Sequence, residues 1–293
     1  MQKLTGLIVA VMGGDAREVT LVEHLADAGA TVKTFGLPVS GGNIIPCREP
    51  EKCLAGVQAL ILPVPGVNQY MQLHSAYLER PLKVTGELLA LLPSGSPVLV
   101  GMARKPLREL VESIGLDLVE LMKLDEVAIL NSIPSAEGAV QMAMESMPIT
   151  IHGSKAIVLG FGRTGQTLAQ LLSAMHAQTT VVARDPAQLA RAVAMGLKAV
   201  HFNELMNCLS DVDVIFNTVP APVLDKDVLV KVPSTTLIID LASAPGGTDF
   251  ASAEELGVKA ILAPGLPGKV APKTAGRILA QVVPRILLQR VKH

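Results

Sequence analysis

The stretch that decides the fold is residues 156–165, Ala-Ile-Val-Leu-Gly-Phe-Gly-Arg-Thr-Gly. An apolar run leads into glycines spaced G-x-G-x-x-G, and a helix-period segment and a second apolar run follow. This order is typical of dinucleotide-binding units of the Rossmann type. Gly160 permits the tight turn, Gly162 lets the backbone approach a pyrophosphate, and Gly165 allows close helix–strand packing. We predict a pyrophosphate site at the helix N-terminus, a tight turn without a ligand being the alternative.

Further cofactor residues are expected beside this turn. Ligands of such sheets bind beyond the carboxyl ends of the strands, and three later apolar runs end in small or polar residues. Ordinary turn chemistry is the alternative for each of them taken singly. The additional residues predicted to contact the cofactor are Phe161, Arg163, Thr164, Thr218, Val219, Pro220, Leu241, Ala242, Gly265, Leu266 and Pro267.

The end of the second strand of this unit bears on the type of cofactor. NAD sites usually have Asp or Glu there, whereas this chain has Ala183 followed by Arg184. An acid would repel a 2′-phosphate, and an arginine can bind it with two hydrogen bonds. We therefore expect NADP, with NAD left open, and a solvated charge as the alternative role of Arg184. Asp185, before Pro186, has the features of a helix N-cap rather than of a ribose ligand.

The whole chain of 293 residues alternates short apolar runs with helix-period segments. That pattern is typical of parallel sheets covered by helices on both faces. The predicted fold is α/β, with two doubly wound parallel-sheet (Rossmann-like) domains and an interdomain cleft. We expect a substrate or partner domain at residues 1–130, a connecting helix at 131–151 and an NAD(P)-binding domain at 152–271. The helical segment 272–291 is expected to complete the first domain, with Pro284 as a kink.

The apolar runs also predict the individual strands. They are expected at 7–12, 31–35, 57–63, 97–100, 117–120, 156–159, 179–182, 198–202, 214–217, 237–241 and 259–262. The helical segment 125–146 is expected to break at 131–134, because Pro134 fits the first position of a helix. Glu137 then lies in the first turn, where a carboxylate suits the helix dipole.

The first domain has its own glycine turn, Gly13-Gly14-Asp15-Ala16-Arg17. It lacks the third glycine of the dinucleotide motif, but amides near Gly14 and the charge of Arg17 suit a carboxylate. A small anionic substrate is therefore expected there. The alternative is that Asp15 caps the helix and Arg17 is a surface charge. Further polar candidates are Lys273 near a later strand end, and Asn131, Ser132 and Glu137 on the connector.

Composition argues against several classes of protein. The net charge is −1, aromatic residues make up 2% and Trp is absent, so neither a basic field nor a stacking platform for nucleic acid is expected. No apolar run reaches the roughly 18 residues of a membrane span. Three unpaired cysteines favour a reduced, cytoplasmic protein, and six histidines without ligand spacing argue against a metal site. The 49% hydrophobic content leaves a homo-oligomer open.

Five blocks of sequence carry a family resemblance. They are GGDAR at 13–17, NSIPSAEG at 131–138, GFGRTG at 160–165, DLASAPGGTDF at 240–250 and APGLPGKVAPKTAG at 263–276. Together they resemble the A subunit of dipicolinate synthase, a family of spore-forming bacteria, and they keep their order over nearly the whole chain. The block at 160–165 is generic, whereas those at 131–138 and 263–276 are far more specific. One departure is Ala244, whose place a basic residue can take in the family.

The resemblance implies a cytoplasmic, mother-cell enzyme that works with a flavoprotein-like B subunit of dipicolinate synthase. Together they would oxidise a dihydrodipicolinate to dipicolinate, an aromatic dicarboxylate. Such a reaction needs a hydride acceptor, cations for two carboxylates and a base for one ring proton. NADP would accept the hydride, and Arg17 and Lys273 would bind the carboxylates. Glu137 and Asp15 are both candidates for the base, and the sequence does not rank them.

Two other functions stay open from the sequence. One is a nucleotide-binding subunit without catalysis, whose flavoprotein partner carries out the redox chemistry. The other is a relative of the 2-hydroxy acid dehydrogenases, which have a similar two-domain layout. Those enzymes need a His acid/base and an Arg near the late strand ends, and neither follows Asp240 or Leu262 closely.

Overall fold

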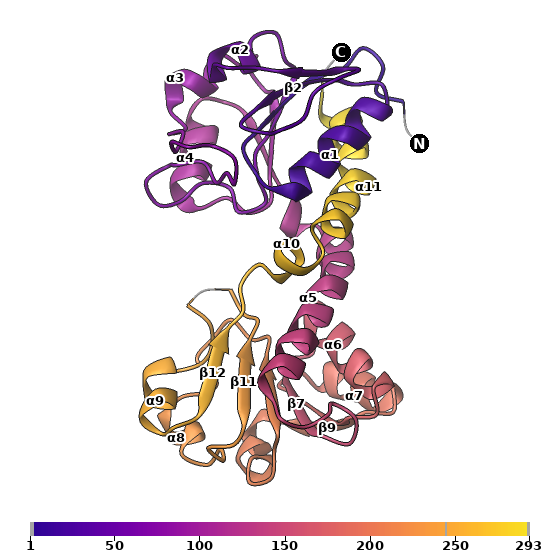
Figure 1. Ribbon diagram of the computed structural model, residues 1–293, viewed down its shortest axis with the longest axis vertical. Coiled ribbons are helices and arrows are strands. Elements are labelled where there is room, and N and C mark those ends of the chain that lie inside the picture. The colour runs from indigo at the N-terminus through magenta and orange to yellow at the C-terminus, as the bar shows by residue number, and fades with distance from the viewer. Residues whose placement is uncertain (1–2, 244, 292–293) are drawn as a thin grey trace. The chain divides into compact units, whose positions relative to one another are not determined.

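The computed structural model describes residues 3–243 and 245–291. The chain divides into two compact units, one made of the stretches up to Ala128 and from Ala271 onward, the other of Ile129–Val270. Each unit contains a six-stranded sheet in which all strand pairs are parallel, with helices packed against it (Figure 1). The prediction of two Rossmann-like α/β sheets is therefore confirmed.

The first unit has the strand order β3-β2-β1-β4-β5-β6. Its strands are β1 (Ile8–Met12), β2 (Thr31–Phe35), β3 (Ile44–Pro46), β4 (Ala59–Ile61), β5 (Pro97–Val100) and β6 (Asp117–Glu120). Its helices are α1 (Ala16–Asp27), α2 (Pro50–Leu54), α3 (Gly86–Leu89), α4 (Lys105–Ser113), the 3-10 turn Leu121–Lys123 and α11 (Pro272–Arg290). The strand order reverses between β1 and β4, which is the place where ligands of such sheets bind.

The second unit repeats this order as β12-β11-β10-β7-β8-β9, with the reversal between β7 and β10. Its strands are β7 (Lys155–Leu159), β8 (Gln178–Ala183), β9 (Lys198–His201), β10 (Val214–Asn217), β11 (Leu237–Asp240) and β12 (Lys259–Leu262). Its helices are α6 (Arg163–Ala174), α7 (Pro186–Ala194), the 3-10 helix Phe202–Cys208, α8 (Lys226–Leu229), α9 (Phe250–Glu255) and α10 (Leu266–Val270), and α5 (Asp125–Ser146) joins the two units in sequence.

Every predicted strand is present, whereas β3 and α2 are elements that the apolar pattern does not predict. Both are short, and β3 is half-exposed or exposed along its three residues. A strand of that length in a segment rich in Gly and Pro has no hydrophobic pattern to reveal it.

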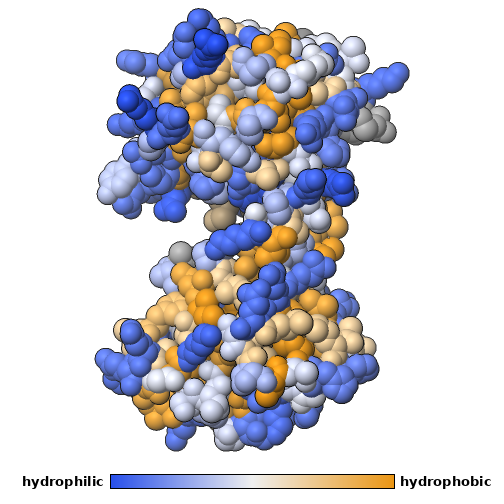
Figure 2. Space-filling view, viewed as in Figure 1, coloured by the Kyte–Doolittle hydropathy of each residue, from blue (hydrophilic) through white to orange (hydrophobic). Residues whose placement is uncertain are grey.

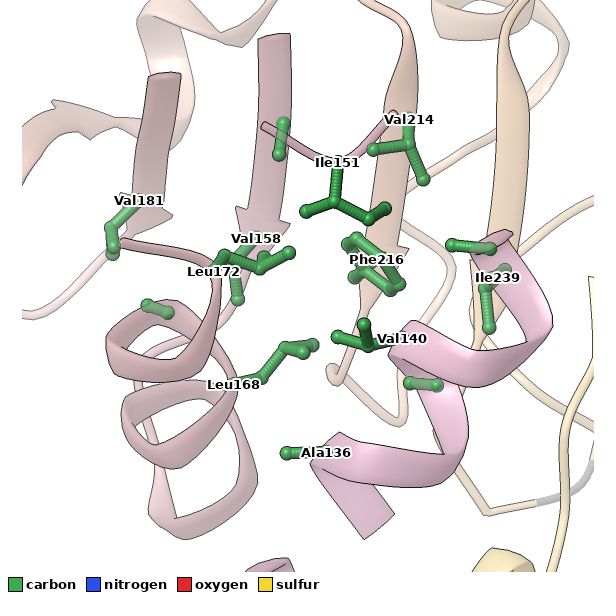
Figure 3. Packing of buried hydrophobic residues seen from close by; sticks show 14 of the residues in the cluster. Ala136, Val140, Ile151, Val158, Leu168, Leu172, Val181, Val214, Phe216 and Ile239 are labelled. Carbon is green, nitrogen blue, oxygen red and sulfur yellow. The ribbon is translucent and has the colours of Figure 1, made fainter. Parts of the chain in front are cut away.

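One of the two hydrophobic clusters of the second unit lies between its sheet and the helices on one face (Figure 3). Phe216 of β10 is fully buried and pairs in register with Val158 of β7. Val140 of α5 and Leu168 of α6 pack in the same cluster, pointing toward these strands in Figure 3. Burying side chains of this size contributes about 1.5–3 kcal/mol each. The cluster therefore holds α6, and the turn that precedes it, on the sheet.

The helix expected at 131–151 begins earlier and has no break, because α5 spans Asp125–Ser146 with Pro134 in its interior. The predicted break is therefore wrong. Proline removes one amide donor from the helix ladder. The hydroxyls of Ser132 and Ser135 each donate to a carbonyl three or four residues earlier, at 2.6 and 2.9 Å. Pro134 is buried, so the tertiary packing of α5 keeps the helix continuous across the proline.

Helix α11 packs along α1, and the two lie side by side in Figure 1. The contact is close at Gly276, where a Cβ would lie 2.6 Å from the carbonyl oxygen of Arg17 and 2.7 Å from Cβ of Thr20. Only glycine permits this approach. Residues from the end of the chain thus complete the unit that the beginning of the chain opens, with Pro284 inside α11.

Several large apolar side chains lie on the surface of both units. Tyr70 is 66% exposed in the first unit, and Val193 is 62% exposed in the second. Figure 2 shows hydrophobic residues, in orange, interspersed with hydrophilic ones, in blue, on one face of the molecule. Formation of a homo-oligomer would bury surface of this kind, and the oligomeric state stays a prediction.

No helix in the described part of the chain has the length and apolar character of a membrane span. Over the same residues, no three His, Cys, Asp or Glu side chains gather closely enough to hold a metal ion. The three cysteines are free thiols, of which Cys53 is buried.

Candidate functional site

The glycine turn of the second unit follows β7 and opens α6. Gly160 has a φ of +87°, and a Cβ there would lie 2.7 Å from Oγ1 of Thr218. A Cβ on Gly165 would lie 2.1 Å from the carbonyl oxygen of Gly160. Both positions therefore require glycine, one for the backbone conformation and both for the close approach of turn, helix and neighbouring loop.

Gly162 differs from these two glycines in its surroundings. It is the N-cap of α6 with a φ of −79°, and no side chain caps the helix there. A Cβ on Gly162 would meet no atom within 4 Å. By contrast, the Asp185 carboxylate caps α7, as predicted, accepting from the amide of Ala187 at 2.8 Å. Among the described residues no side chain caps the N-terminus of α6, and the space beside Gly162 is open, which is the arrangement that binds phosphate.

The loop after β10 lies directly beside the glycine turn. The Thr218 hydroxyl donates to the carbonyl of Leu159 at 2.8 Å. The fully buried Asn217 accepts from the Val219 amide at 2.9 Å and donates to the Val219 carbonyl at 3.2 Å. These bonds fix the predicted residues Thr218 and Val219 next to the turn at the β7/β10 reversal.

The loop after β11 is held by one fully buried carboxylate, that of Asp240. It accepts from the amides of Ala242 and Gly247 at 3.0 and 2.8 Å, and from the Thr248 hydroxyl at 2.7 Å. Gly247 in turn accepts the amides of two residues in the loop after β10, at 3.0 Å each. The loops after β10 and β11 are therefore joined to each other by hydrogen bonds. Ala244, where the chain departs from the family, lies outside the described residues.

Some predicted cofactor residues point inward instead. Phe161 is 0% exposed and Leu266 is 4% exposed, and both belong to the hydrophobic core. Pro267 and Ala242 are also buried. The side chains of Phe161, Leu266 and Pro267 thus pack inside the protein, and the contacts of these residues with the cofactor stay predictions. The candidates that are exposed are Gly162, Arg163, Pro220 and Gly265, while Thr164 and Leu241 are half-buried.

Gly265 to Pro267 also lie at the far side of the sheet. They follow β12, the edge strand, which is three strands from β7 in the order β12-β11-β10-β7. At ~4.8 Å per strand the two strands are roughly 14 Å apart. At that distance these residues would reach a part of the cofactor other than the pyrophosphate held at Gly160, and their cofactor contact stays a prediction.

Arg184 is exposed immediately after β8, and Ala183 before it is buried. Its guanidinium lies 5.3 Å from the ring centroid of Phe202, within cation–π range. The stacking orients the side chain without using its hydrogen-bond donors. No carboxylate occupies the end of β8, since Asp185 is committed to the cap of α7.

In the first unit, Asp15 and Arg17 form a closed pair rather than an open anion site. Arg17 Nε and Nη2 donate to the two Asp15 carboxylate oxygens at 2.9 and 2.7 Å, and the Arg17 side chain is only 9% exposed. Asp15 also caps α1, as the alternative interpretation had it. The Arg17 side chain is therefore mostly buried and engaged with Asp15, and its contact with a substrate carboxylate stays a prediction.

Asp15 is also a poor proton acceptor. Burial raises the pKa of its carboxyl, but the hydrogen bonds and the charge of Arg17 outweigh burial and lower the pKa from 3.8 overall. Gly14 is not open to a substrate either, since its amide donates to the carbonyl of His74 at 2.9 Å. A Cβ on Gly14 would lie 2.5 Å from Oε2 of the buried Glu18. The turn is thus built around internal contacts.

Replacing Asp15 by asparagine is expected to destabilise the protein by about 2 kcal/mol at pH 7, because the buried Arg17 loses its anionic partner while the helix cap remains. The folded-state pKa of Asp15 lies below 3.8, so its stabilisation is present above that pH and is lost as the pH falls below it. Urea unfolding at pH 7 and pH 3 tests this.

The difference in free energy of unfolding between wild type and Asp15→Asn should be smaller at pH 3 than at pH 7. Glu49→Gln is the control, because the ion pair of Glu49 with Lys52 is exposed and contributes little. An equal difference at both pH values would contradict the assigned role of Asp15.

The remaining predicted site residues, three on α5 and Lys273 on α11, differ in their exposure. Ser132 is 1% exposed, and its hydroxyl lies 2.6 Å from that of Thr167 on α6; its substrate contact stays a prediction. The Ser132–Thr167 contact ties two helices together instead. Asn131 is half-buried, and Glu137 and Lys273 are exposed; the roles of these three stay predictions.

The first unit also contains a cavity of about 330 Å³ that the sequence does not predict. It lies where β4 and β5 end, and its lining includes His74 and Arg104. His74 Nε2 is 3.8 Å from Oδ2 of Asp15. No pattern links these residues in sequence, because the fold brings together three separate strand ends.

Two family models match different parts of the chain. Residues 8–122 match the N-terminal domain of the dipicolinate synthase A subunit. Residues 141–249 match the model of shikimate / quinate 5-dehydrogenase. The first match lies within the first unit, and the second lies within the unit that carries the glycine turn.

Individual relatives agree with the first of these matches. The dipicolinate synthase A subunit of Bacillus subtilis (strain 168) is 39% identical over 289 residues, covering 98% of this chain and 97% of that protein. The crystal structure of the dipicolinate synthase A subunit from Bacillus halodurans has a TM-score of 0.94 and 40% identity, over 97% of this chain and 99% of that one.

More distant structures share the fold alone. A D-isomer specific 2-hydroxyacid dehydrogenase from Lactobacillus delbrueckii ssp. bulgaricus, solved in an NAD-complexed form, has a TM-score of 0.60 at 11% identity, over 96% of each chain. The sequence identity to the two Bacillus proteins, 39% and 40% over nearly their whole length, is more than three times as high. It confirms the resemblance carried by the five sequence blocks. The chain belongs to the family of the dipicolinate synthase A subunit.

Proposed function

We propose that this chain is an NADP-dependent dehydrogenase subunit of dipicolinate synthase, which oxidises a dihydrodipicolinate to dipicolinate. The observation that carries the proposal is the uncapped N-terminus of α6 behind Gly160 and Gly162, at the β7/β10 strand reversal. It occurs in a chain that belongs to the family of the dipicolinate synthase A subunit. The dehydrogenase fold is shared with a protein that was crystallised with NAD.

In this proposal the residues of the second unit bind and orient the cofactor. Amides at the start of α6 hold the pyrophosphate, aided by the helix dipole. Thr218 and Val219 set the floor of the site beside the turn, since their loop is fixed by Asn217. The nicotinamide, when bound, supplies the hydride acceptor that aromatisation of the substrate requires.

The proposal includes the B subunit of dipicolinate synthase as partner and the cytoplasm of the mother cell as the place of action. The support is the name of the relatives, which implies a second component. The reaction test uses the purified chain with its B partner and freshly made dihydrodipicolinate. Reduction of NADP in step with dipicolinate formation is expected. Dipicolinate formation without NADP reduction would overturn the catalytic proposal and favour a nucleotide-binding subunit whose partner carries out the oxidation.

Arg184→Ala is expected to weaken NADP binding about 10-fold and to leave NAD binding unchanged. Arg184 directly follows Ala183, the position where NAD-binding sites have a carboxylate, and one charged hydrogen-bonded contact is typically about 1.5–3 kcal/mol. Isothermal titration calorimetry with each cofactor measures the effect. Arg191→Ala is the matched control, because Arg191 is an exposed arginine on the neighbouring helix α7. Equal losses for both cofactors would contradict a 2′-phosphate contact.

A further inference from the structure

We propose that the cavity where β4 and β5 of the first unit end is the dicarboxylate site, with Arg104 binding a substrate carboxylate and His74 accepting the ring proton. This inference rests on the proposed function and adds the substrate-binding residues to it.

The position of the cavity is the first argument. The first unit has the same strand order as the second, so its own ligand position lies beyond the carboxyl ends of β1 and β4. The segment 65–75 that follows β4 forms most of the lining, and Arg104 follows β5. The cavity has a volume of about 330 Å³, which is within the range of small-molecule sites.

The charge of the lining is the second argument. Arg104 is exposed at the N-cap of α4, and no hydrogen bond or ion pair engages its guanidinium among the residues described. The described residues that line the cavity include no Asp or Glu. Arg104 therefore gives the cavity a positive charge that suits a carboxylate, and its planar fork allows two hydrogen bonds. Unlike Arg17, it has no partner to give up among those residues.

The position of His74 is the third argument. Its amide donates to the carbonyl of Gly66 at 3.1 Å, and its carbonyl accepts from Gly14 at 2.9 Å. A Cβ on Gly13 would lie 2.7 Å from that same carbonyl oxygen. The two glycines thus admit the backbone of His74 against the turn. The imidazole, half exposed, remains at the cavity with Nε2 3.8 Å from Asp15.

The Arg17–Asp15 pair then has a role toward His74. Arg17 holds the Asp15 carboxylate with two hydrogen bonds, and the carboxylate faces Nε2 of the imidazole. A carboxylate on that side favours the proton on Nε2 and leaves Nδ1 as the acceptor. The 3.8 Å separation is longer than a hydrogen bond, as is common for catalytic contacts before substrate binds. Asp15 and Arg17 are therefore positioning residues rather than substrate ligands.

The proposed reaction is balanced in protons and electrons. A dihydropyridine dicarboxylate loses two hydrogens on becoming aromatic. One ring C–H proton passes to His74 and then to solvent, while a hydride from another ring carbon passes to oxidised nicotinamide. One dicarboxylate is thereby oxidised and one NADP is reduced, and one proton is released. Arg104 binds a carboxylate and so holds the ring with its C–H bond toward the imidazole.

The test measures binding of the product, pyridine-2,6-dicarboxylate, by isothermal titration calorimetry to wild type, Arg104→Gln and His74→Gln. Arg48→Gln is the control, because Arg48 is exposed in the same unit and does not line the cavity. Arg104→Gln is expected to weaken binding about 10-fold. His74→Gln is expected to lower kcat about 100-fold in the reaction with the B subunit, with a smaller change in KM. NADP binding should stay unchanged in all three variants.

Wild-type affinity for the dicarboxylate in Arg104→Gln, or wild-type kcat in His74→Gln, would overturn the inference while leaving the proposed function standing. If instead wild type binds the dicarboxylate but no NADP, the proposed function fails, and a loss of dicarboxylate binding in Arg104→Gln still supports the cavity. Asp15→Asn adds a readout for positioning. Its kcat should fall with KM and the Kd for the dicarboxylate nearly unchanged, whereas a purely structural role would leave kcat at the wild-type value in the folded variant.

Discussion

Gly162→Asp is expected to weaken NADP binding by about 1,000-fold or more while leaving the protein folded. A Cβ at this position meets no atom within 4 Å, and the φ of −79° is allowed for any residue. The new carboxylate would accept from the first amides of α6, as Asp185 does at α7, and would place a negative charge where the pyrophosphate is expected. Losing two charge-assisted hydrogen bonds at about 1.5–3 kcal/mol each accounts for a change of this size.

Because Gly162→Asp is expected to stay folded, a loss of NADP binding can be told apart from a loss of folding. Aspartate is a better N-cap than glycine by a few tenths of a kcal/mol, so the melting temperature should stay equal or rise slightly. Gly162→Ala, which adds a Cβ without charge, is the matched control and should bind NADP within about 10-fold of wild type. Calorimetry gives the affinities, and thermal unfolding shows that the variants are folded. Wild-type NADP affinity in Gly162→Asp would remove the basis of the proposed function.

Asp240→Ala is expected to destabilise the second unit by about 4 kcal/mol. The carboxylate is fully buried and accepts three hydrogen bonds, from the amides of Ala242 and Gly247 and the hydroxyl of Thr248. Each buried donor left without a partner costs about 1–3 kcal/mol. Because Gly247 also accepts amides from the loop after β10, the loss should extend to both loops beside the glycine turn.

Asp225→Ala is the matched control for this substitution. Asp225 is an exposed aspartate of the same unit and caps α8 through one bond of 3.0 Å to the Val228 amide. Its removal should cost about 1 kcal/mol, as for other N-caps. Urea unfolding followed by circular dichroism measures both variants. Equal losses would show that the Asp240 network contributes no more than a single helix cap.

The fold could be predicted from the sequence because parallel strands buried on both faces are apolar at nearly every position. The runs at Val214–Asn217 and Leu237–Asp240 show this, since all eight residues are buried. The conformational demands at Gly160 and Gly165 were equally predictable, because a tight turn and a close helix contact restrict those positions to glycine whatever the surroundings.

The polar contacts of the first unit could not be predicted in the same way. His74 meets Asp15 across 59 positions of sequence, through loops that have no periodicity. Whether the Arg17 guanidinium pairs with a neighbouring carboxylate or stays open to a ligand depends on its side-chain rotamer rather than on the spacing of residues in the sequence. Pro134 has an intrinsic preference for a helix start, and the tertiary packing of α5 overrides that preference.

The packing of α11 on α1 has a consequence for biosynthesis. The second unit is made of one continuous stretch, so it can condense as soon as residue 270 has left the ribosome. The first unit begins earlier but lacks the partner of α1 until residues 272–290 emerge. Translation therefore delivers a finished second unit before the first, reversing the usual N-to-C sequence of domain maturation.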